Sequence, residues 1–149
     1  MASQGRWTQA VYAEARQSSR YWPSLNTVID RQLLGEPIEV VDADQVNRIR
    51  IARLAGSPEK PTEHLGEAET CYLIHNCDEY KGAVWITDDH DAFDFGQQYG
   101  IVTWDTRHLF EMHIANAELT AQKAFELMQE MLALDRTLRR MPAHYRDLQ

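Results

Sequence analysis

Two short apolar segments most constrain what this chain can fold into. The first, residues 83–87, runs directly into Asp88 and Asp89, and the second, residues 101–103, follows after a stretch with helical spacing. Two such segments joined by a helix predict parallel strands, and open α/β sheets build their sites at the carboxyl ends of such strands. Carboxylates gathered there suit a hard divalent cation such as Mg²⁺ or Mn²⁺. The alternative interpretation is that Asp88 or Asp89 caps the helix that follows.

Neighbouring residues at a strand end point to opposite sides, so we expect one of Asp88 and Asp89 to be a ligand and the other a cap. Two further acidic positions lie on predicted helices: Glu14 in the first, and Glu67 with Glu69 in a later one. Residues two apart on a helix diverge by about 200°. We therefore favour Glu67 over Glu69 as a site residue.

Composition sets limits on the class of protein. The length of 149 residues predicts a single domain, and the net charge of −8 argues against broad, non-specific adhesion to nucleic acid. It does not exclude a nuclease, because a bound metal offsets the acids around it. No apolar stretch reaches the roughly 20 residues that span a bilayer. Cys71 and Cys77 point to different helical faces, which predicts free thiols and a cytoplasmic location without membrane contact.

Apolar periodicity and capping residues predict the elements along the chain. Strands are predicted at 37–41, 83–87 and 101–103, and helices at 7–20, 23–34, 42–55, 65–76, 90–99, 106–117 and 120–134. Helices alternating with short strands indicate a layered α/β domain. We assign residues 1–141 to it and expect residues 142–149 to form a mobile C-terminal tail.

Four segments together resemble a PIN domain, in the variety with a Gly-Glu-x-Glu helix and an Asp-Asp strand end. The resemblance covers residues 7–131 and rests on the order and spacing of these segments: 7–14, 65–70, 85–89, and 100–103 with Thr106. It implies an α/β fold in the form of a three-layer α/β/α sandwich with a short, mainly parallel sheet.

The resemblance also implies a function. PIN domains are metal-dependent endoribonucleases, often the toxin of a toxin–antitoxin pair, so it implies an RNA substrate and an antitoxin protein as partner. By position, Glu14, Glu67 and either Asp88 or Asp89 match three of the family's four acidic residues. These side chains would hold one or two Mg²⁺ or Mn²⁺ ions and activate a water for attack on the phosphate.

The family's first strand, which carries an aspartate, has no counterpart here. Residues 1–6 contain neither an apolar run nor an acid. Either the natural chain begins upstream, or the chain is a remnant without the strand, or a partner supplies it. Unpaired strand edges predict a homodimer or a partner-bound protein. The alternative function is therefore a non-catalytic PIN-like interaction module, or an inactive truncated nuclease.

Overall fold

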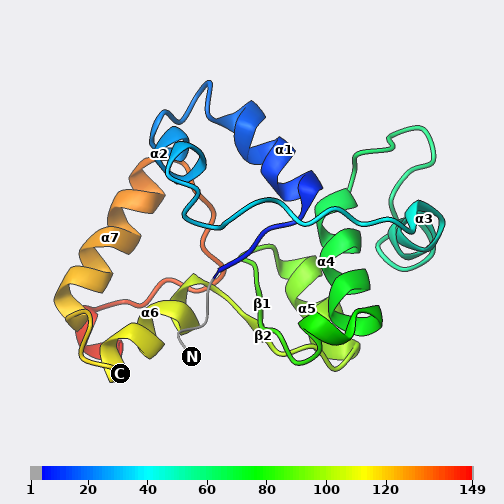
Figure 1. Cartoon of the computed structure of the whole chain (residues 1–149). Coiled ribbons are helices and arrows are strands. Elements are labelled where there is room, and N and C mark those ends of the chain that lie inside the picture. The colour runs from blue at the N-terminus through cyan, green and yellow to red at the C-terminus, as the bar shows by residue number, and fades with distance from the viewer. Residues whose placement is uncertain (1–4, 149) are drawn as a thin grey trace. The chain divides into compact units, whose positions relative to one another are not determined.

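The structure is a computed structural model that describes residues 5–148. Within these residues the chain forms seven α-helices, two short 3₁₀ turns and two strands, labelled in Figure 1. It divides into two compact units, Met1–Lys81 and Gly82–Gln149. Among the described residues, no helix combines the length and apolar character that crossing a membrane requires.

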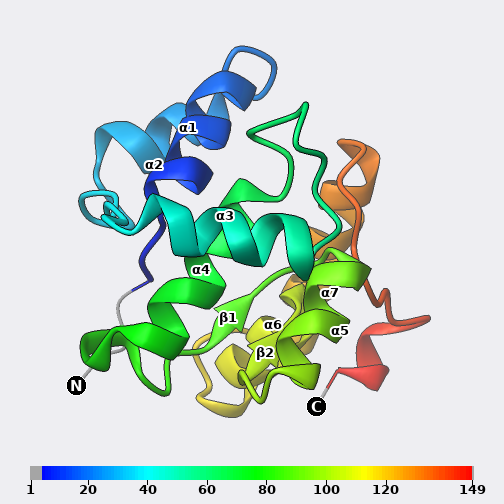
Figure 2. The ribbon, with the colours of Figure 1, turned by 90° about the vertical axis from the view of Figure 1, so that its right-hand side faces the viewer.

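Among its described residues, the regular structure of the N-terminal unit is helical apart from one isolated bridge. It contains α1 (Gln9–Ser18), α2 (Ser24–Asp30), α3 (Ala43–Ala52) and α4 (Leu65–Asn76), followed by a 3₁₀ turn, η1 (Asp78–Tyr80). Helix α4 contacts both α1 and α3, and its buried residues include Ala68 and Cys71. Figure 2 shows α3 crossing in front of α4. Burial of this apolar face supplies the stabilisation that short helices lack on their own.

A buried arginine holds the loop that joins α3 to α4. Arg50 is only 3% exposed, and its Nη1 donates to the carbonyl oxygens of Ser57 and Lys60, each at 2.9 Å. Its Nε donates to the side chain of Asn47 at 3.2 Å. A buried guanidinium is tolerated only where its donors find acceptors, so the loop is shaped around this side chain.

The C-terminal unit is built on one βαβ element. Strands β1 (Trp85–Ile86) and β2 (Thr103–Trp104) pair in parallel, and α5 (His90–Gln98) connects them. A Cβ at Gly96 of α5 would meet the side chains of Thr103 and Trp85, so glycine allows the helix to approach the sheet closely. Helices α6 (Thr106–Ala115) and α7 (Ala121–Ala133) follow.

The segment that we expected to be a mobile tail packs on α7 instead. It contains a 3₁₀ turn, η2 (Tyr145–Asp147), and Leu148 is only 4% exposed. Leu148 lies in one apolar cluster with Ala124 and Met128, both fully buried in α7. Burying these side chains stabilises the C-terminal segment against the helix.

The predicted three-layer α/β/α sandwich is wrong, because the described chain is mostly helical and its only sheet has two strands of two residues each. The strand predicted at 37–41 forms a single parallel bridge, between Ile38 and Thr8. Helical layers need a broad sheet face on which to pack, and such a small sheet offers none. The question of a strand before residue 7 falls largely on residues 1–4, which lie outside the described residues.

Candidate functional site

Helices α1 and α4 bring three glutamates of the N-terminal unit close together. We call Glu14, Glu67 and Glu69 the acidic cluster. Gly66 makes the approach of the two helices possible, because a Cβ there would lie 2.9 Å from Cγ2 of Val11 and 3.7 Å from Oε1 of Glu14. The glycine that precedes Glu67 is therefore what allows the glutamates of α4 to approach Glu14.

Burial and the charges of Glu67 and Glu69 act on Glu14. The pKa of Glu14 is raised, first because neighbouring atoms displace part of its hydration and then because the charges of Glu67 and Glu69 lie close by. Glu14 as a residue remains exposed, so water screens part of this repulsion. A group of like charges at this position would be stabilised by a cation.

Glu69 has a structural role that the sequence analysis missed. Its Oε2 accepts a hydrogen bond from the backbone N–H of Ala10 over 2.9 Å, in the first turn of α1. Carboxylates are favourable there, because the first amides of a helix have no partner within the helix. Glu69 therefore contacts α1 directly, and the choice of Glu67 over Glu69 as a site residue stays a prediction.

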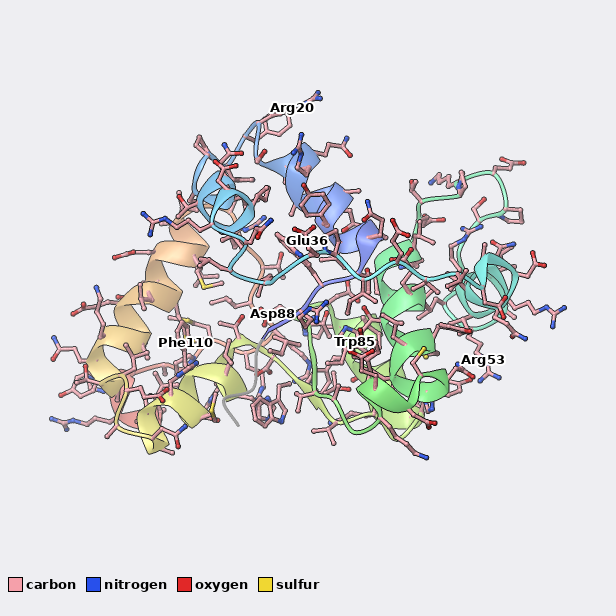
Figure 3. The ribbon with its side chains drawn as sticks, in the orientation of Figure 1. Arg20, Glu36, Arg53, Trp85, Asp88 and Phe110 are labelled. Atoms are coloured by element: carbon pink, nitrogen blue, oxygen red, sulfur yellow. The ribbon has the colours of Figure 1, made fainter. Side chains whose placement is uncertain are left out.

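The two aspartates that follow β1 belong to the C-terminal unit. Asp89 caps α5, accepting from the N–H of Ala92 at 2.8 Å, so the capping interpretation is confirmed for this residue. Asp88 accepts from the N–H of Thr106 at 3.2 Å and also from the Thr106 hydroxyl. It accepts a third bond from the N–H of Arg139 at 3.2 Å. Asp88, labelled in Figure 3, thus joins three segments of its unit.

Sequence reasoning overlooked a third aspartate at this end of the sheet. Asp105 directly follows β2 and is fully buried. It accepts from Nε and Nη2 of Arg140 at 2.6 and 3.1 Å, and from the N–H of His108 at 2.9 Å. Burial alone would raise the pKa of Asp105, but these bonds outweigh it and hold the pKa well below its ordinary value. The argument that selected Asp88, an aspartate after a predicted strand, applies equally to Asp105.

Two arginines therefore neutralise the carboxyl end of the small sheet. Arg139 also approaches Asp105, at 3.4 Å, and its guanidinium lies 3.7 Å from the centre of the Phe93 ring. Stacking on an aromatic face and pairing with a carboxylate both favour arginine over lysine. The aspartates after β1 and β2 thus serve the architecture of the C-terminal unit.

The predicted site residues accordingly fall into two groups, Glu14 with Glu67 in one unit and Asp88 with Asp89 in the other. Within residues 5–148, no group of three or more histidine, cysteine, aspartate or glutamate side chains is arranged to hold a metal ion. Carboxylate oxygens such as those of the acidic cluster are the ligands that Mg²⁺ and Mn²⁺ prefer, but the described residues do not arrange them as a metal site.

Comparisons of the chain with protein-family models, with curated proteins and with solved structures gave no match.

Proposed function

We propose that the chain is a metal-dependent endoribonuclease that hydrolyses RNA phosphodiester bonds, with Glu14 and Glu67 among the groups that bind Mg²⁺ or Mn²⁺. One observation carries the proposal: Glu14 lies close to Glu67 and Glu69 across the α1–α4 contact, and its pKa is raised there. Mutual repulsion of carboxylates costs stability unless a cation or a proton offsets it. Proteins retain such arrangements at functional sites more often than elsewhere.

The residues of the cluster have separable roles in this proposal. When bound, a divalent ion lowers the pKa of a water molecule and stabilises charge on the phosphate. Glu67 would supply oxygen to the ion. Glu14 would supply a further oxygen, because a bound cation offsets the repulsion that contributes to its raised pKa. Glu69 is a positioning residue, because its bond to the Ala10 N–H fixes α1 against α4.

The test is Mn²⁺-dependent cleavage of a single-stranded RNA by the wild type, Glu14→Gln and Glu67→Gln. We expect both amides to lower the cleavage rate by at least about 100-fold, the scale of losing one group that stabilises charge in the transition state. Glu39→Gln, an exposed glutamate outside the helices, removes the same charge and serves as control. Cleavage at the wild-type rate in Glu67→Gln would overturn the proposal.

Asp89 needs a separate test because it caps α5. Asparagine caps a helix about as well as aspartate, so Asp89→Asn removes the charge while leaving the fold intact. If Asp89 acts only as a cap, cleavage by this variant will equal that of the wild type. Loss of cleavage in a fully folded Asp89→Asn protein would add Asp89 to the site residues.

A second candidate function, a non-catalytic interaction module, rests on the exposed face of the small sheet. Trp85 is buried, whereas Ile86 on β1 is 49% exposed and Val102 beside β2 is 52% exposed. Parallel sheets are ordinarily covered on both faces. A second copy of the chain, or the antitoxin that the resemblance implies, would cover these side chains. Light scattering of the wild type and of Ile86→Ser tests for a homodimer, and a monomer in both would count against self-association.

A further inference from the structure

An open cleft lies between α1 and α2 in the N-terminal unit. Its volume is about 780 Å³, within the range of roughly 300 to 1,000 Å³ found for ligand sites. Most of its lining side chains are polar and carry hydrogen-bond donors: Gln9, Tyr12, Arg16, Gln17, Arg20 and Asn26. Such a lining suits a charged, hydrogen-bonding ligand better than an apolar one.

The cleft is locally basic in an acidic protein. Residues 5–31 hold four arginines and two acidic residues, whereas the whole chain has a net charge of −8. Two of the arginines, Arg16 and Arg20, line the cleft together with a single acid, Asp30. No ion pair joins either arginine to a carboxylate within the described residues. Figure 3 shows Arg20 projecting outward at the end of α1.

Aromatic side chains accompany these arginines. Tyr21 directly follows Arg20 and is 79% exposed, the second most exposed of the large hydrophobic residues. Tyr12 lines the cleft, and its hydroxyl accepts from Nη1 of Arg16 at 3.5 Å. A positive groove with aromatic rings on which bases stack is the general means of binding a single-stranded nucleic acid.

We propose that the α1–α2 cleft binds single-stranded RNA, with Arg16 and Arg20 contacting successive phosphates and Tyr21 stacking on a base. Arg16 lies in the last turn of α1 and Arg20 lies in the turn that follows it, so both guanidinium groups come from one end of the cleft. Amide side chains such as those of Gln17 and Asn26 can hydrogen-bond a 2′-hydroxyl, which DNA lacks. The choice of RNA rests on the function proposed above.

The cleft and the acidic cluster share one helix. Glu14 and Arg16 are two residues apart, so their side chains diverge by about 200° around α1. Glu14 is directed toward the glutamates of α4, whereas Arg16 lines the cleft against α2. A strand held by Arg16 and Arg20 therefore lies on the α2 side of α1, away from Glu14.

The experiment measures binding alone. A fluorescently labelled single-stranded RNA oligonucleotide is titrated with the full chain in EDTA, which prevents metal-dependent cleavage. We expect Arg16→Gln/Arg20→Gln to weaken binding at least about tenfold and to reduce the salt dependence by about 1.4 in log–log slope, the value for two lost phosphate contacts on a single strand. Arg48→Gln, an exposed arginine on α3, is the control and should change affinity less than about twofold.

Variants of Tyr21 test the RNA-binding proposal independently of the arginine variants. Tyr21→Ala should weaken binding by about tenfold, whereas Tyr21→Phe retains the stacking ring and should bind as the wild type does. Unchanged affinity in the double arginine variant would overturn the inference, as would equal affinity for a DNA of the same sequence or tighter binding of an acidic peptide. RNA binding without any cleavage supports the cleft and rejects the nuclease. Cleavage with unaltered RNA binding in the double variant does the reverse.

Discussion

Arg140 donates two hydrogen bonds to the buried carboxylate of Asp105, from Nε at 2.6 Å and from Nη2 at 3.1 Å. Asp105 is inaccessible to solvent, while the Arg140 side chain is 38% exposed. A bidentate arginine–carboxylate pair of this kind is among the strongest hydrogen-bonded interactions that side chains make. It also explains how a charged group can lie in the interior of such a small unit, because an unpaired buried carboxylate would be strongly unfavourable.

Replacing Arg140 should therefore destabilise the C-terminal unit. We expect Arg140→Gln to lower the free energy of unfolding by about 3 kcal/mol, since removing one partner leaves the other charge buried. Arg140→Lys should lose less, because lysine keeps the charge without the planar fork. Urea denaturation measures both, with Arg146→Gln, an exposed arginine, as control. Equal stability of Arg140→Gln and the wild type would show that Arg139 and His108 suffice to hold Asp105.

The same pairing predicts a dependence of stability on pH. Because the folded state holds the pKa of Asp105 below its ordinary value of 3.8, its contribution is fully present above that value. The contribution is lost as the pH falls from about 4 through the lower, folded pKa. Asp105→Asn removes this titration. Its unfolding free energy should be lower than that of the wild type at pH 7 and should change less below pH 4. Parallel acid denaturation curves would contradict this assignment.

Gly66 sets the distance between α1 and α4, and its replacement tests that contact. In Gly66→Ala the new methyl group would approach Cγ2 of Val11 to 2.9 Å. Overpacking costs about 1–3 kcal/mol, and the gain in helix propensity returns up to about 1. We expect a net loss of about 1 kcal/mol in urea denaturation. In a Val11→Ala background the clash disappears, and the same substitution should become stabilising. An identical effect in both backgrounds would show that the helices are not in tight contact here.

The helices could be predicted closely from the sequence because their signals are local. Helix α4 spans Leu65–Asn76, as its periodicity predicts, and Thr120 caps α7 by accepting from the N–H of Lys123. Sheet pairing depends on partners distant in the chain. The β-rich segment around Ile38 therefore looked like a strand, although within residues 5–148 it forms only one bridge, to Thr8. The prediction of a three-layer architecture was wrong here, because tertiary contacts decide whether such a segment forms a strand.

Site residues were predictable to the extent that their roles depend on neighbours in sequence. The capping role of Asp89 follows from its position before a helix. The partners of Asp105 could not be predicted in this way, because Arg140 lies 35 residues later in the chain. The positions of Arg16 and Arg20 relative to α2 likewise emerge only from the packing of the first two helices.

Glu14 offers a test that links stability to metal binding. Its pKa is raised above the ordinary value of 4.5, so its charged form is disfavoured in the fold. At pH 7 its charge therefore opposes folding, and this penalty disappears as the pH falls below 4.5 and the carboxyl is protonated in both states. We expect Glu14→Gln to raise the melting temperature at pH 7 without metal, by an amount worth less than about 1 kcal/mol because solvent screens this exposed residue.

Adding Mn²⁺ should reverse the order of the two melting temperatures, so that the wild type melts above Glu14→Gln. An ion bound only by the folded state stabilises it in proportion to the logarithm of its concentration above Kd. The wild type should therefore gain melting temperature on adding Mn²⁺, and Glu14→Gln should gain less, so that the two curves cross. The control Glu39→Gln should follow the wild type at every Mn²⁺ concentration. If Mn²⁺ shifts Glu14→Gln as far as the wild type, the acidic cluster does not bind the ion through Glu14, and the nuclease proposal loses its central residue.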